Sequence, residues 1–262
     1  MQRETITSLQ NARIKNVVVL REKSRERSKQ MLFSVEGKRE INMAIVGGYE
    51  IDSLFICPEF CEQYSFRAKN VYEVTRKVFE KIACREESDG YLALMKMKSN
   101  SLHDISISSA PFIIVLESVE KPGNLGAILR TADAANVDAV IVCDPKSDLF
   151  NPNVIRSSLG CVFTVNTAVC SSEKACEWLK KNNISIYAAE LESSQWYYDE
   201  DYTKKSAIVM GAESTGLSNF WLNNANKRIK IPMRGKVDSL NVSVSTAIIT
   251  FEAMRQRTMN EQ

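Results

Sequence analysis

The sequence predicts an α/β fold: a C-terminal domain with a mostly parallel sheet, preceded by a smaller α/β unit. From residue 112 onward, short apolar segments alternate with segments of helical spacing, which is typical of parallel sheets covered by helices on both faces. A serine-rich stretch that ends in proline, residues 99–111, separates this region from a unit of ordinary domain size. We therefore expect a first domain over 1–98, a linker over 99–110 and a second domain over 111–262.

The first domain is expected to mix helices and strands. Apolar residues at helical spacing predict a helix over 11–22, and a second helix over 38–46 is closed by two glycines. Between them, the run REKSRERSKQ, residues 21–30, is expected to be a solvated charged stretch that precedes an apolar run at 31–35. The other expected elements are strands at 51–57, 70–74 and 91–97 and a helix at 76–83.

The second domain is expected to alternate strands and helices to its end. Expected strands cover 112–117, 139–143, 163–166, 184–189, 207–210 and 229–231. Expected helices cover 124–135, 153–159, 173–181 and 243–257. Ligands of open α/β sheets bind where the strands end, so the segments that follow these strands are the places to look for chemistry.

Composition excludes several classes of function. The 262 residues, 44% hydrophobic and 25% charged, match a soluble globular protein and not a disordered or fibrous one. His103 is the single histidine, which rules out a multi-histidine metal centre and leaves one residue for any Ser-His-Asp arrangement. The seven cysteines, an odd number, contain no C-x-x-C pair, so neither a zinc ribbon nor a redox motif is expected, and we expect no metal site.

Location and charge point to a polyanion partner. No apolar run is long enough to span a bilayer, so we expect no membrane segment, and the unpaired cysteine pattern favours the reducing cytoplasm. The net charge is only +2, yet residues 1–48 hold ten basic and five acidic residues. This portion therefore carries +5 and the remainder −3, which favours binding of a polyanion near the N-terminus.

A first candidate segment, ESVEKPGNLGAILR over residues 117–130, joins a predicted strand to a predicted helix. Asn124 is placed to cap that helix, and Arg130 lies in its second turn, where a guanidinium reaches the surface or binds a phosphate with two hydrogen bonds. The glycine spacing matches neither the G-x-G-x-x-G pattern nor a P-loop, so dinucleotide and nucleoside triphosphate binding are not supported. A plain capped helix is an equally good interpretation of the spacing alone.

Two further candidate segments follow later strands. In IVMGAESTGLS, residues 208–218, two glycines flank Glu213, which suits either a loop whose backbone wraps a ligand or a tight turn. In IPMRGKVDSLNVSVST, residues 231–246, hydroxyl and amide side chains alternate with apolar ones at the start of the last helix. They suit capping of that helix or hydrogen bonds to a small polar ligand, and local rules do not choose between the two.

In order and in spacing, the three segments resemble the signature motifs of the SpoU (TrmH-type) RNA 2′-O-ribose methyltransferases of the SPOUT superfamily. The matching strings are N-L-G-A-I-L-R, G-A-E-x-x-G-L-S and S-L-N-V-S. Residues 154–160, VIRSSLG, are similar to the segment that lies between the first two motifs of this family. Similarity to its small substrate-binding domain is carried by Asn11-x-x-Ile14-Lys15, Phe33-x-x-Glu36-Gly37 and Asp89-Gly90-Tyr91, so the resemblance covers nearly the whole chain.

The resemblance implies a fold, an activity and partners. The second domain would carry the deep trefoil knot of the superfamily, an exception to the rule that chains do not thread loops. The protein would be a homodimer with its active site at the subunit interface, and its first domain would resemble small RNA-binding ribosomal proteins. Its activity would be methyl transfer from S-adenosylmethionine to a ribose 2′-hydroxyl of rRNA or tRNA, with no metal.

The resemblance also implies roles for individual residues. The cofactor would be held, largely by backbone groups, at Met210, Gly211, Ala212, Glu213, Gly216, Ile231, Pro232, Met233, Ser239 and Leu240. The positions that match catalytic residues of the family are Asn124, Arg130, Glu213, Ser239 and Asn241. The basic residues expected to contact RNA are Arg13, Lys15, Arg21, Lys23, Arg25, Arg27 and Lys38.

Arg130 has two possible roles in such an enzyme. Its counterparts in the family are often assigned as general base, but a guanidinium pKa above about 12 leaves little free base. We expect Arg130 to hold the substrate phosphate and stabilise the developing alkoxide, with Asn124 orienting it. Two other functions stay open at this point: a non-catalytic RNA-binding relative that keeps the knot, and a related enzyme that methylates a base.

Overall fold

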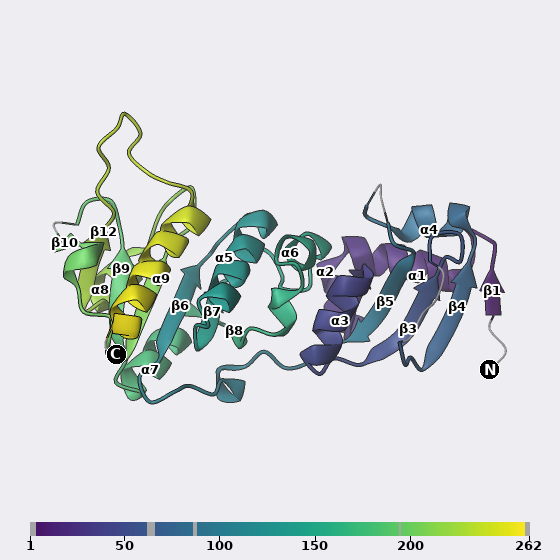
Figure 1. Cartoon of the computed structure of the whole chain (residues 1–262), viewed down its shortest axis with the longest axis horizontal. Helices are drawn as coiled ribbons and strands as arrows, with labels where there is room; N and C mark the ends of the chain where they lie inside the picture. The colour runs from purple at the N-terminus through teal and green to yellow at the C-terminus, as the bar shows by residue number, and fades with distance from the viewer. Residues whose placement is uncertain (1–3, 62–65, 86–87, 194, 260–262) are drawn as a thin grey trace. The chain divides into compact units, whose positions relative to one another are not determined.

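The computed structural model describes residues 4–61, 66–85, 88–193 and 195–259 (Figure 1). It divides into two compact units, Met1–Lys98 with Asp148–Thr164 and Ser99–Ser147 with Val165–Gln262. Residues 148–164, which we expected in the second domain, therefore pack within the first unit.

The first unit is built on a mixed sheet. In the described residues its five strands run in the order β1-β4-β3-β5-β2, with β5 antiparallel to both neighbours and the other pairs parallel. These strands are β1 (Glu4–Ile6), β2 (Leu32–Glu36), β3 (Ile51–Ile56), β4 (Asn70–Val74) and β5 (Tyr91–Lys96). The helices are α1 (Ala12–Glu22), α2 (Ser24–Gln30), α3 (Lys38–Val46), α4 (Arg76–Ile82) and α6 (Pro152–Ser157). The core joins Ile14, Val17 and Leu20 of α1 to Phe55 of β3 and Phe79 of α4.

Local sequence features place most of these elements as predicted. Asn11 caps α1, because its side-chain oxygen accepts a hydrogen bond from the backbone N–H of Arg13 at 2.8 Å. The predicted helices at 38–46 and 76–83 are α3 and α4. The stretch over 21–30 is helical, since α1 continues to Glu22 and α2 covers Ser24–Gln30. It is mostly exposed, as expected, with the exception of the buried Arg27. Strand β1 was not predicted at all.

Arg27 explains why this charged stretch is folded. Its side chain is 2% exposed, and its guanidinium donates to the carbonyl oxygens of Leu20 at 2.6 Å and Arg21 at 3.0 Å. The same group pairs with both carboxylate oxygens of Asp148, at 3.2 and 2.5 Å. A buried charge needs such partners, so α2 is drawn into the unit. The RNA contact expected at Arg27 is corrected accordingly, because its guanidinium is buried and makes four hydrogen bonds within the fold.

Aromatic packing holds residues 148–164 in the first unit. The ring of Phe33 stacks on Phe150 with centroids 4.3 Å apart, and Phe163 lies 5.7 Å from the same ring. Tyr49 meets Phe163 edge-on at 5.2 Å. At Gly47 a Cβ atom would lie 2.1 Å from the carbonyl oxygen of Phe163, so only glycine permits this approach. The segment is therefore part of the core of this unit.

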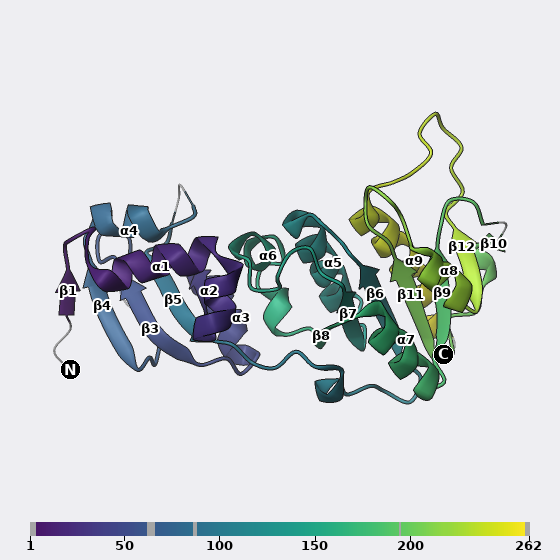
Figure 2. The same cartoon turned by 180° about the vertical axis from the view of Figure 1, so that it is seen from behind.

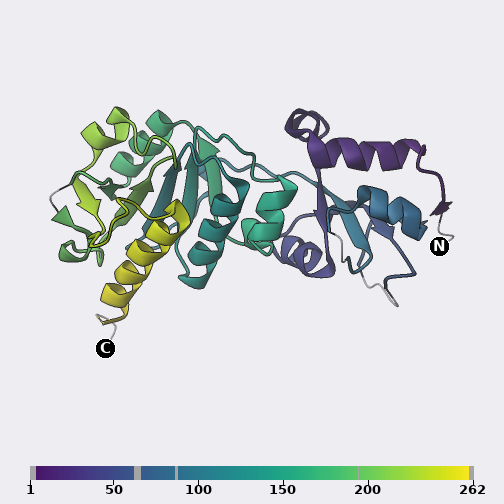
Figure 3. The ribbon, with the colours of Figure 1, turned by 90° about the horizontal axis from the view of Figure 1, so that it is seen from above.

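The second unit contains a parallel sheet, as predicted from the alternating pattern. In the described residues seven strands run in the order β10-β12-β9-β11-β6-β7-β8, and every pair is parallel. The strands are β6 (Phe112–Glu117), β7 (Ala139–Cys143), β8 (Thr167–Cys170), β9 (Ser185–Ala189), β10 (Gln195–Trp196), β11 (Ser206–Met210) and β12 (Lys227–Lys230). The helices are α5 (Pro122–Ala134), α7 (Ser172–Lys181), α8 (Asn219–Asn224) and α9 (Val242–Met259). Helices α5 and α9 lie side by side on one face of the sheet, and α7 and α8 cover the other (Figures 2 and 3).

Two predictions for this part of the chain need correction, and two elements were not predicted. The strand predicted at 163–166 is wrong, because Phe163 ends a short 3-10 turn and the strand begins at Thr167. Helix α5 begins two residues earlier than predicted, at Pro122, so Asn124 lies inside its first turn and Lys121 holds the capping position. The elements β10 and α8 were not predicted. Among the helices that the structure describes, none is long and apolar enough to cross a membrane.

Replacing Arg27 with alanine is expected to lower the free energy of unfolding of the full chain by about 3–5 kcal/mol, because Asp148 and two carbonyl oxygens would be left without their partner. Urea unfolding followed by circular dichroism measures the change. The matched control is Arg25→Ala, in the same helix but exposed, which should stay within about 0.5 kcal/mol. Equal destabilisation of the two variants would contradict a structural role for Arg27.

Candidate active site

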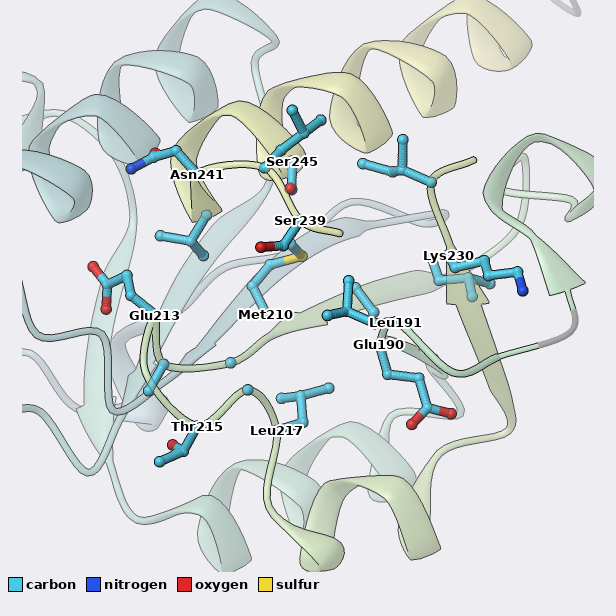
Figure 4. Close-up of a pocket in the computed structure, with 18 of the residues that line it drawn as sticks. Glu190, Leu191, Met210, Glu213, Thr215, Leu217, Lys230, Ser239, Asn241 and Ser245 are labelled. Atoms are coloured by element: carbon cyan, nitrogen blue, oxygen red, sulfur yellow. The ribbon is translucent and has the colours of Figure 1, made fainter. Parts of the chain in front are cut away.

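A cavity of about 750 Å³ lies at the carboxyl ends of β9, β11 and β12 (Figure 4). This volume is within the range of about 300–1,000 Å³ that is usual for small-molecule sites. The residues that line it are Lys121, Ala189–Glu192, Met210–Leu217, Leu222, Ile229–Ile231, Met233, Ser239–Val242, Ser245 and Ile249. The second and third candidate segments therefore share one cavity.

The loop that follows β11 presents bare backbone to this cavity. The backbone groups of Ala212 and Gly216 exchange two hydrogen bonds, of 3.2 and 2.9 Å, which close the loop. A Cβ atom on Gly211 would lie 2.2 Å from the carbonyl carbon of Gly216, and Gly216 itself has a φ of 67°. The first position therefore requires glycine for close approach, and the second favours glycine because of its left-handed conformation.

Glu117, at the end of β6, holds the far side of this loop. Its buried carboxylate accepts hydrogen bonds from the backbone N–H of Ser218 at 2.8 Å and from the Ser218 hydroxyl at 2.6 Å. Glu117 belongs to the first candidate segment, but no role was predicted for it. The hydrogen bonds join the first segment to the second at the edge of the sheet, so Glu117 positions the loop.

A chain of hydrogen bonds links all three segments. Asn124 donates from Nδ2 to Oε1 of Glu213 at 2.5 Å, and Asn241 donates from Nδ2 to Oδ1 of Asn124 at 3.2 Å. The second oxygen of Glu213 accepts the backbone N–H of Glu120 at 3.1 Å. Partial burial opposes ionisation of Glu213, but the hydrogen bonds from Asn124 and from the backbone of Glu120 outweigh it and lower its pKa below the ordinary value. Glu213 is therefore held as a carboxylate with both oxygens engaged.

The third segment begins α9. The Asn241 side-chain oxygen accepts from the backbone N–H of Ser243 at 2.9 Å and from its hydroxyl at 2.6 Å, which caps this helix. The same amide reaches Asn124 through its nitrogen, so this residue both caps the helix and takes part in the site. Ser239 is exposed at the cavity, and its hydroxyl donates to Asp238 at 3.1 Å.

The predicted site residues divide into three groups. Of the ten predicted cofactor positions, all within the described residues, nine line the cavity and Pro232 does not. Asn124 lies one hydrogen bond away, through Glu213. Arg130 is exposed on α5 outside the cavity lining, and among the described residues no hydrogen bond joins it to Asn124. The expectation that Asn124 orients Arg130 therefore finds no contact within one chain.

One wall of the cavity was not predicted from the sequence. Residues 189–192 follow β9, and Lys230 ends β12, on the side opposite Glu213 and Asn241 (Figure 4). The predicted strand at 184–189 carried a usable signal, since its carboxyl end lies at the same edge as that of β11. Without the order of strands in the sheet, nothing in the sequence set this strand apart from the others.

The predicted RNA-contacting residues of the first unit differ in solvent exposure and in the partners they already have. Exposed side chains belong to Arg13, Lys15, Lys23, Arg25 and Lys38. Arg13 also pairs with Glu4 at 3.0 Å. The half-buried Arg21 donates to the carbonyl oxygens of Lys81 and Ala83, at 3.2 and 2.9 Å, at the end of α4. In the part of the chain that the structure describes, no cluster of three or more His, Cys, Asp or Glu side chains is arranged to hold a metal ion.

Similarity to known proteins covers both units. Residues 111–251 match the SpoU rRNA Methylase family, and residues 11–93 match the MRM3-like substrate binding domain. The 23S rRNA (guanosine-2'-O-)-methyltransferase RlmB of Vibrio vulnificus is 34% identical over 228 residues, which cover 85% of this chain and 91% of the relative.

Two solved structures are similar over nearly the full length. An RNA 2'-O ribose methyltransferase is 36% identical with a TM-score of 0.85, covering 97% of this chain and 99% of that chain. The AdoMet-bound rRNA methyltransferase from Sinorhizobium meliloti is 30% identical with a TM-score of 0.89, covering 97% and 98%. The resemblance found in the three sequence segments is thus confirmed by family match and by fold. The chain belongs to the SpoU rRNA methylase family.

Proposed function

We propose that this protein is an S-adenosylmethionine-dependent methyltransferase that methylates a ribose 2′-hydroxyl in ribosomal RNA. The observation that carries the proposal is the hydrogen-bonded chain of Asn241, Asn124 and Glu213 at one end of a ligand-sized cavity. Full-length similarity to proteins named as rRNA 2'-O-methyltransferases supports both the reaction and the substrate class. The match of residues 11–93 to a substrate binding domain supports an RNA-binding role for the first unit.

The cavity fits the proposed cofactor. Gly211 and Gly216, both of which line the cavity, leave backbone without side chains at these two points of the closed loop. Apolar Met210, Leu217 and Ile249 provide a surface for a flat base, and the polar lining supplies hydrogen bonds. The similar Sinorhizobium meliloti enzyme has AdoMet bound. We assign the cofactor to Met210–Gly216, Ile231, Met233, Ser239 and Leu240.

The proposed chemistry needs neither histidine nor metal. The bound cofactor supplies an activated methyl group on a sulfonium, so the protein must mainly orient the ribose oxygen and accommodate loss of its proton. Asn124 and Asn241 are held in fixed orientations by Glu213 and by the start of α9. Glu213 has both oxygens engaged and serves to position these amides. Arg130 would bind the substrate phosphate and stabilise the developing alkoxide, with the proton passing to phosphate or water.

We propose that the protein acts as a homodimer, through the face of α9 that the chain leaves exposed. Val244 and Phe251 are 46% and 50% exposed and lie seven residues apart, on one side of this helix. Val237 and Leu240, in the preceding loop, are exposed as well. An interface there would place Arg130, which lies outside the cavity of its own chain, within reach of RNA bound between subunits. The trefoil knot and a reducing cytoplasmic location are further parts of this proposal; none of the seven cysteines forms a disulfide.

The function is tested by mapping the product. Ribosomal RNA from a strain that lacks the gene is incubated with the full chain and S-adenosylmethionine, digested and analysed by mass spectrometry. We expect one nucleotide to gain a methyl group on its ribose. A methyl group on a base would identify a base-methylating enzyme instead. Methylation of tRNA alone would correct the substrate, and cofactor binding without any product would identify a non-catalytic relative.

Arg130→Ala is expected to reduce kcat by about 100- to 1,000-fold, as does removal of one donor that stabilises a developing oxyanion. Cofactor affinity, measured by calorimetry, should be unchanged, because Arg130 does not line the cavity. In the wild type, log kcat against pH should lack a rise that depends on Arg130. A steep rise that disappears in Arg130→Lys would show that Arg130 is the general base.

Arg25→Glu is expected to weaken RNA binding and to reduce the slope of log affinity against log salt by about 0.7 for each phosphate that the variant no longer neutralises. Arg25 is the suitable probe because it is exposed, whereas the neighbouring Arg27 is buried. The control is Arg76→Glu, an exposed reversal on α4 whose arginine already pairs with Glu80. An equal change of slope in the two variants would argue against a specific RNA surface at Arg25.

A further inference from the structure

The cavity is lined by more carboxylates than cationic side chains. Among the described residues its lining has two cationic side chains, Lys121 and Lys230, and three carboxylates, Glu190, Glu192 and Glu213. The Lys230 ammonium lies 4.8 Å from the centre of the Trp196 ring, so its charge already has a partner. Lys121 is exposed, and its ammonium has no ion pair or hydrogen bond within the described residues.

The two lysines belong to opposite ends of the cavity. Lys230, like Glu190, lies on the side of the cavity away from Glu213 and Asn241 (Figure 4). Lys121 directly follows Glu120, whose backbone N–H donates to Glu213, and it caps the helix that carries Asn124. Lys121 therefore lies at the end where the three segments meet.

The neighbouring carboxylates do not neutralise Lys121. Glu213 accepts from Asn124 at 2.5 Å and from the Glu120 backbone at 3.1 Å. The Glu120 carboxylate accepts the hydroxyl of Ser214 at 3.2 Å. Neither lies within ion-pair distance of the Lys121 ammonium, so this charge is available to a ligand.

The covalent structure of the cofactor selects between the lysines. In S-adenosylmethionine only three carbon atoms separate the sulfur from the carboxylate carbon, while the adenosine extends the other way. If the methyl group is transferred beside Asn124 and Asn241, the carboxylate must lie within a few ångströms of that end. Lys121 is then the cavity cation within reach, and Lys230 lies on the adenosine side.

We propose that Lys121 binds the α-carboxylate of S-adenosylmethionine and so fixes the direction of the methyl donor. This inference rests on the proposed function. A cation at this place also gives the site a means to distinguish the full amino acid from ligands that lack its carboxylate, because a carboxylate gains a charge-assisted hydrogen bond that a neutral group does not.

The test compares two ligands by calorimetry with the full chain: S-adenosylmethionine and decarboxylated S-adenosylmethionine, which lacks only the carboxylate. Lys121→Met removes the charge and keeps most of the length, Lys121→Arg keeps the charge, and Lys230→Met is the matched control. We expect Lys121→Met to lower the affinity for S-adenosylmethionine by about 10- to 100-fold. The affinity for the decarboxylated ligand should be unchanged. Lys121→Arg should retain most of the preference, and Lys230→Met should leave the ratio of the two affinities as in the wild type.

Several results would overturn the inference. If Lys121→Met lowers the affinity for both ligands equally, or changes neither affinity, Lys121 does not bind the carboxylate. A change in RNA affinity with unchanged cofactor affinity assigns Lys121 to the RNA instead. Failure of the wild type to bind S-adenosylmethionine rejects the proposed function itself, and the inference with it. Thermal unfolding of each variant shows that the comparison is made on folded protein.

Discussion

The carboxylate of Glu213 receives hydrogen bonds from residues 89 and 93 positions earlier in the chain, and much of the site depends on this convergence. One oxygen fixes the Asn124 amide, whose own oxygen then accepts from Asn241 at the start of α9. Three segments that follow different strands are thereby held in fixed positions relative to one another. Because each member is fixed by another, the loop after β11 and the start of α9 are ordered together, and the cavity between them has a defined shape.

Where a local pattern decided the structure, the sequence was sufficient. Apart from Glu117, the strands at 112–117 and 139–143 are apolar, and they are buried and bounded by turn residues; their predicted limits agree with the structure. The helix at 38–46 likewise has its predicted limits. Where the structure of a segment depends on a residue far away in the chain, the sequence did not predict it. Arg27 looks like one more solvated cation until Asp148, 121 residues later, is brought beside it.

The site shows the same division. Gly211 and Glu213 could be selected from their spacing after a strand, and the structure explains both by close approach and by hydrogen bonds. The role of Glu117 depends on Ser218, 101 residues away, and residues 189–192 depend on β9 lying next to β11. Such relations follow from the order of strands, which no local pattern specifies. Arg130 is the reverse case, since its sequence context singled it out and one chain alone leaves it outside the cavity.

Because residues 148–164 belong to the first unit, the two units of this chain are not joined by a single linker. The chain passes between the two units three times, after Lys98, after Ser147 and after Thr164. A substrate-binding module joined by one linker can be exchanged by a single recombination event. Here, removal of the first 98 residues would strip Phe150 and Phe163 of the aromatic partners that bury them. A cut after Lys98 would therefore leave residues 148–164, which belong to the first unit, attached to the second.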